Sequence, residues 1–136
     1  MILARIWRFM AGYEYSFSAE PSLHVLKDAW VLIEYFHNGA GEVDERRYVP
    51  ARLLSGREVA LAKDYAGGGF TKELHPLVKL EVYGLVNLDD RSHFVGPALT
   101  WNALSDLHLT AGLQRFGGTE RSEYGRLANA AYAQAA

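Results

Sequence analysis

The feature that most constrains this chain is a hydrophobic pattern with a period of two. Apolar and polar side chains alternate over residues 7–17, 28–36, 78–88, 95–102 and 107–114. Successive side chains of a β-strand point to opposite faces, so each segment is predicted to be a strand with one oily face. The first segment shows it well, with one face formed by Trp7, Phe9, Ala11, Tyr13, Tyr15 and Phe17.

Two further segments fit the same pattern less well. Within residues 56–74, one oily face could be shared by Ala66, Gly68, Phe70 and Leu74, which predicts a strand of uncertain register. The tail, residues 127–136, is rich in alanine, which favours a helix. It has no amphipathic stripe, however, so a short seventh strand is predicted. The expected fold is therefore all-β, an antiparallel up-and-down meander of about seven strands in a single segment, residues 1–136.

Composition removes several classes of protein. The chain has 136 residues, a formal net charge of -2 and no cysteine. The charge balance argues against a nucleic-acid partner, and the lack of cysteine excludes disulfides and thiolate metal sites. The longest apolar run, residues 29–33, is far shorter than a membrane-spanning helix requires.

The connections between the predicted strands alternate in length. Residues 18–22, 75–76 and 103–106 are short or tight, whereas residues 38–56, 88–92 and 117–126 are longer and more polar. Short turns at one end and longer loops at the other are typical of a barrel that spans an outer membrane. Aromatic residues also gather near strand ends, as in an interfacial girdle; they are Tyr15, Phe17, Tyr35, Phe70 and Trp101.

The predicted faces opposite the oily ones carry charges of both signs and neutral hydrogen-bonding groups. Such a set suits a hydrated lumen, because a dry core would bury these groups at a high cost. The residues predicted to line a pore are Arg8, Glu14, Glu34, Lys79, Glu81, Asn102, His108 and Gln114. The alternative is a soluble, lipocalin-like barrel that binds a small apolar ligand against residues 78–88. A third interpretation is an anchor or adhesion scaffold that presents residues 38–56.

The second half of the chain resembles the closing strands of bacterial outer-membrane β-barrels of the porin-like kind. The similarity covers about residues 76–136 and lies in residues 87–97, 99–114, 116–118 and 122–125, the last being Ser-Glu-Tyr-Gly. It implies a Gram-negative outer membrane, lipid as a partner, a possible homo-oligomer and passive passage of small hydrophilic solutes or ions. The chain ends in alanine rather than an aromatic residue, shows no signal peptide and has an odd number of strands. We therefore expect a C-terminal fragment of a larger barrel.

Other sites are not expected. The five histidines, His24, His37, His75, His93 and His108, stand singly, which predicts no metal site. Residues 67–69 are glycines but no Lys-Ser or Lys-Thr pair follows them, so no phosphate loop or cofactor is predicted. Ser92 and His93 are adjacent and Ser105 has no third partner beside His108, so no catalytic triad and no enzyme activity are expected.

Overall fold

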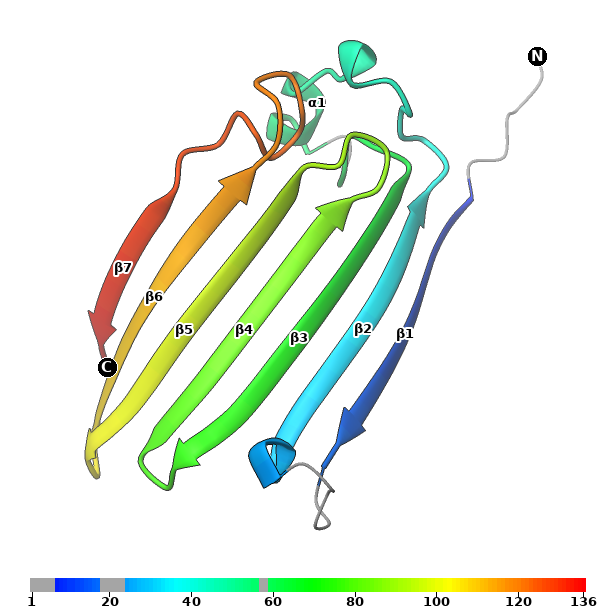
Figure 1. The fold of residues 1–136 in the computed structure, drawn as a ribbon. Coiled ribbons are helices and arrows are strands. Elements are labelled where there is room, and N and C mark those ends of the chain that lie inside the picture. The colour runs from blue at the N-terminus through cyan, green and yellow to red at the C-terminus, as the bar shows by residue number, and fades with distance from the viewer. Residues whose placement is uncertain (1–6, 18–23, 57–58) are drawn as a thin grey trace.

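The structure is a computed structural model, and it describes residues 7–17, 24–56 and 59–136. Seven strands form one sheet and stand side by side in chain order (Figure 1). They are β1 (Arg8–Ser16), β2 (Ala29–Asn38), β3 (Asp64–His75), β4 (Val78–Asn87), β5 (His93–Leu104), β6 (Leu107–Gly117) and β7 (Ala130–Ala135). The short helices are η1 (His24–Leu26), η2 (Glu45–Arg47) and α1 (Ala51–Leu54).

Every neighbouring pair of strands is antiparallel. The predicted all-β antiparallel meander is therefore confirmed, including the strand at the alanine-rich tail. Strands β1 and β7 are the two edges of the sheet. Connections 39–63, 88–92 and 118–129 meet at one end, called the loop end here, and α1 lies among them (Figure 1). The opposite end, with connections 17–28, 76–77 and 105–106, is called the turn end.

Strand register sorts the side chains into two faces, because residues directly opposite in an antiparallel pair share a face. Glu34 of β2 lies opposite Gly12 of β1 and Gly67 of β3. Its neighbour Ile33 lies opposite Tyr13 and Gly68. Followed across all seven strands, the Glu34 row defines the polar face and the Ile33 row defines the apolar face.

One boundary differs from the prediction, and one predicted turn lies outside the described residues. The short turn expected at residues 18–22 is that turn; β1 ends at Ser16 and β2 begins at Ala29, close to the start expected at residue 28. Phe17 extends the pairing by hydrogen bonds with Asp28 and Ala29, and η1 precedes that closure. Strand β3 begins only at Asp64, because Asn38 holds the preceding segment as a loop through the carbonyls of Ala60 and Ala62.

The main buried cluster is at the loop end. Tyr48, Ala60, Leu61, Ala62 and Tyr65 form it, and Phe36, Leu53, Leu85 and Tyr124 pack against it. Its strand members all belong to the polar face, so the long connections fold over that face. No helix within the described part of the chain is long and apolar enough to cross a membrane.

Candidate functional site

All eight residues predicted to line a pore lie on the polar face. On β1, Arg8 and Glu14 lie an even number of residues from Gly12 and so share its face. On β4, Lys79 and Glu81 lie opposite Glu73 and Thr71 of the same face. Asn102 of β5 lies opposite His108 of β6, and Gln114 follows on β6 opposite Ala130. The alternation in sequence therefore assigned these residues to one shared face correctly.

Only some of these side chains meet one another. Lys79 Nζ and Glu81 Oε1 form an ion pair of 3.0 Å along β4. His108 Nδ1 and Asn102 Oδ1 are 2.6 Å apart near the turn end. Arg8 donates instead to Asn38 Oδ1, at 2.9 Å. In the described residues, Glu14, Glu34 and Gln114 form no hydrogen bond or ion pair with another member of the set.

The apolar face carries an uncharged band bounded by ionisable residues. On β3 the band lies between Asp64 at the loop end and Lys72 near the turn end. Eight residue steps separate them, about 26 Å along the strand at about 3.3 Å per residue. Large apolar side chains of the band remain exposed, among them Ile33 at 63% and Leu99 at 43%. Exposed apolar surfaces of this kind typically mark an interaction site.

Aromatic side chains of the apolar face lie toward the ends of the band. At the turn end, Tyr15 and Phe17 meet edge to face, with ring centroids 4.8 Å apart, and Tyr15 shares its row with Phe70. At the loop end, the ring of Phe9 packs against Tyr35 and His37. These aromatic residues lie near the strand ends, as the sequence predicted, and Trp101 lies near the turn end of β5, opposite Val78.

A buried carboxylate joins the long connections at the loop end. Glu123, which is 8% exposed, accepts hydrogen bonds from Tyr65 Oη at 2.5 Å, Asn87 Nδ2 at 3.0 Å and the Leu61 backbone N–H at 3.3 Å. The same Asn87 amide donates to Tyr48 Oη at 3.2 Å. We call Tyr48, Tyr65, Asn87 and Glu123 the loop clasp, since they link β3, β4 and two connections.

A second set of contacts fixes the turn between β4 and β5 to the last connection. Asp90 Oδ2 accepts from the Glu123 N–H at 2.8 Å, and Ser92 Oγ accepts from the Tyr124 N–H at 3.2 Å. Asp89 Oδ2 accepts from the N–H groups of residues 63 and 64. No buried side-chain nitrogen or oxygen of the described residues lacks a hydrogen-bond partner, so this end of the sheet is closely fixed.

Burial governs the electrostatics of the loop clasp. Removal from water raises the pKa of Glu123, while its three donors oppose that rise and the charge of Asp90 adds to it. Burial likewise raises the pKa of Tyr48 and of Tyr124. Both phenols therefore remain neutral donors or acceptors over the physiological range.

The sequence did not identify the loop clasp. Asn87 had a local signal, because an Asn in a polar connection commonly forms an Asx turn with the backbone two residues on. Its Oδ1 accepts from the N–H groups of Asp89 and Asp90. Glu123 had none, since it lies 58 residues from Tyr65. The clasp does join segments 87–97 and 122–125, on which the resemblance rested.

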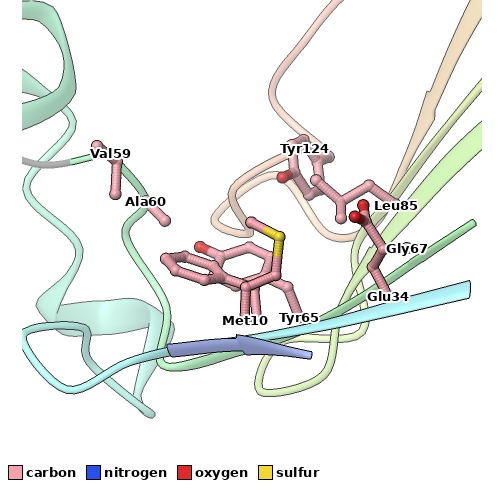
Figure 2. Close-up of a pocket in the computed structure, with 9 residues that line it drawn as sticks. Met10, Glu34, Val59, Ala60, Tyr65, Gly67, Leu85 and Tyr124 are labelled. Atoms are coloured by element: carbon pink, nitrogen blue, oxygen red, sulfur yellow. The ribbon is translucent and has the colours of Figure 1, made fainter. Parts of the chain in front are cut away.

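A cavity of about 400 Å³ lies between the polar face and its loop cover. Figure 2 shows Val59 and Ala60 of the long connection on one side and Tyr124, Leu85 and Glu34 on the other. Tyr65 and Met10 lie between them (Figure 2). The cavity is therefore bounded by four strands of the polar face, β1 to β4, and by two connections.

Elsewhere, no group of three or more His, Asp or Glu residues within the described ranges is placed to hold a metal ion. Comparison with known proteins gave no match, since no family model, curated protein or solved structure proved significantly similar to this chain.

Proposed function

We propose that this chain forms the wall of a transmembrane β-barrel in the outer membrane of a Gram-negative bacterium. The barrel acts as a porin-like channel for the passive passage of small hydrophilic solutes or ions. The observation that carries the proposal is the separation of the two faces: charged and hydrogen-bonding residues share one face, and the other has an uncharged band. In such barrels the apolar side faces lipid and the polar side faces the lumen.

The placement of the loops supports the same orientation. Long connections pack on the polar face through Phe36, Tyr65 and Leu85. A lipocalin-like barrel would place its apolar face inward instead, and the buried cluster described above does not include that face. Passage through the lumen requires no covalent step, and ionic selectivity follows from the fixed charges on its wall, such as Lys79 and Arg8.

The experiment begins with the source cell. Outer-membrane and soluble fractions are separated, and the protein is identified by peptides from residues 78–91. The purified protein is then added to a planar lipid bilayer. Recovery in the outer membrane with stepwise, ohmic conductance is the expected result. Recovery in the soluble fraction overturns the proposal in favour of a soluble binding barrel, and membrane recovery without conductance favours an anchor.

A further inference from the structure

Among the charged residues described on the polar face, Glu34 combines a place in the cavity lining with the lack of a described partner. Its side chain lines the cavity under the loops, and within the described residues it has no hydrogen bond or ion pair. By contrast, Lys79 and Glu81 neutralise each other, and Arg8 is bound to Asn38. The carboxylate of Glu34 is thus free of any partner among the described residues and can pair with a ligand.

The residues beside Glu34 leave it accessible from the cavity. Its two cross-strand neighbours are Gly12 and Gly67, which have no side chain to cover it. The Glu34 side chain lies against Gly12, where an added Cβ would approach its Cγ to 3.1 Å. At Gly67 an added Cβ would approach Leu85 Cδ1 to 3.2 Å, so a larger residue there would crowd the cavity floor.

The remaining lining is apolar or aromatic. The rings of Phe36 and Tyr65 have centroids 6.0 Å apart and are tilted by 32°. Leu85, Met10 and Tyr124 complete the side walls. Of the described residues that line the cavity, Glu34 alone is charged. A cavity of about 400 Å³ lies in the size range of small-molecule sites, which commonly combine an apolar lining with few polar groups.

The shape of the cavity is set before any ligand enters. Tyr65 Oη accepts from the Ala62 N–H at 2.8 Å and donates to Glu123 at 2.5 Å, so its ring cannot swing freely. The same hydrogen bonds hold residues 60–62 over the sheet. A preformed wall reduces the ordering cost of binding.

We propose that this cavity binds a small organic cation whose body is apolar or aromatic and whose charged nitrogen pairs with Glu34. The carboxylate supplies the charge among the described lining residues, and the rings of Phe36 and Tyr65 suit both an apolar body and a cation. Gly67, which has no side chain, leaves space beside Glu34. The cation would be a solute of the proposed channel. Its route to the cavity rests on that proposed function, whereas its binding rests on the cavity alone.

The test measures binding to the full chain folded in detergent micelles. Three probes of nearly equal size are titrated by calorimetry at neutral pH, namely benzylamine as the cation, benzyl alcohol as the neutral form and benzoate as the anion. Benzylamine is expected to bind most tightly. Glu34→Gln is expected to weaken benzylamine about tenfold, the effect of losing one charge-assisted hydrogen bond, and to leave benzyl alcohol unchanged.

Glu14→Gln is the matched control, because Glu14 is a carboxylate on the same face outside the cavity lining. It should leave benzylamine binding unchanged. Equal affinity for all three probes, no binding, or equal losses in both variants would overturn the proposal. Binding in micelles does not depend on conductance, so an absent channel current with intact, Glu34-dependent binding refutes the channel alone.

Discussion

Tyr65 Oη donates a hydrogen bond of 2.5 Å to Glu123 Oε2, and this bond joins strand β3 to a connection 58 residues away. Both groups are almost fully buried. A buried carboxylate that loses a donor retains its desolvation cost, so the bond matters more than an exposed one would. It also places the Tyr65 ring in the cavity wall.

Replacing Tyr65 by Phe tests this bond directly. The ring stays and the hydroxyl is lost, leaving Glu123 with two donors and the Ala62 N–H without its acceptor. We expect the free energy of unfolding to fall by about 1–3 kcal/mol. Urea unfolding of the protein in detergent measures it. Tyr13→Phe removes a hydroxyl from a residue that is 68% exposed and should change little; an equal loss in both variants would show that the bond contributes nothing.

The pH dependence of stability follows from the raised pKa of Glu123. Its ordinary value is 4.5, and burial makes the folded protein hold the proton more tightly than the unfolded chain. This contribution is therefore complete below about pH 4.5 and is lost as the pH rises through the higher folded pKa. We expect the contribution of Glu123 to make unfolding by urea require more denaturant at pH 4.5 than at pH 8.

Other carboxylates also titrate in this range, so the comparison needs a variant. Glu123→Gln removes the titrating group and should reduce the difference in unfolding free energy between the two pH values. Asp106→Asn, in the tight turn at the other end of the sheet, is the control and should leave that difference as it is. A pH difference unchanged by Glu123→Gln would contradict the assignment.

The sequence predicted the sheet well, for a physical reason. Alternation is a local property, and Trp7 to Phe17 show it without reference to any other segment. It placed Arg8, Glu81 and Gln114 on the same face although they lie on different strands. It could not predict the loop cover in the same way, because Glu123, Asn87 and Tyr65 meet only after the strands have paired.

The sequence predicts less well where a tertiary contact overrides the local pattern. A strand was expected within residues 56–74, but Asn38 donates to the carbonyls of Ala60 and Ala62, and residues 59–63 form a loop. The second strand, expected from residue 28, pairs from Asp28, which has a positive φ of 58°. Composition does not specify a backbone conformation of this kind.

A glycine in the last connection offers a test of the loop cover. Gly118 has a φ of +143°, and an added Cβ would lie 2.3 Å from Ser122 Oγ and 2.7 Å from Ser92 Cβ. Gly118→Ala should therefore strain the backbone and push connection 118–129 away from connection 88–92. We expect trypsin to cleave after Arg121 and Arg126 faster in this variant.

Gly56→Ala is the matched control. Gly56 also has a positive φ, of +68°, but an added Cβ there meets nothing within 4 Å. The alanine should cost only about 1 kcal/mol from its backbone conformation and leave cleavage at the two arginines unchanged. Similar protection of both variants would mean that the packing around Gly118 does not hold the connection.

The orientation of the sheet in a membrane can be tested with two neighbouring residues of β5. Leu99 is on the apolar face and Ala98 on the polar face, opposite Glu81. An arginine at position 99 would face lipid near the middle of the band, at a cost of about 2–4 kcal/mol. Leu99→Arg should thus lower the unfolding free energy in lipid bilayers, whereas Ala98→Arg should not. The reverse order would place the polar face toward lipid.

The fixed charges of the polar face should set ionic selectivity. Lys79→Glu replaces the ion pair with Glu81 by two negative charges, which attract cations to the lumen wall. We expect the reversal potential in a planar bilayer with a salt gradient to shift toward the cation equilibrium potential. Arg8→Glu should act in the same direction.

Arg115→Glu makes the same change of charge on the other face, since Arg115 lies opposite Val95 of the apolar face. The sheet separates its charge from the lumen, and at 0.1 M salt the electrostatic effect of that charge is screened over about 10 Å. The reversal potential should therefore stay at the value of the unmodified protein. A shift with Arg115→Glu and none with Lys79→Glu would assign the ion path to the opposite face.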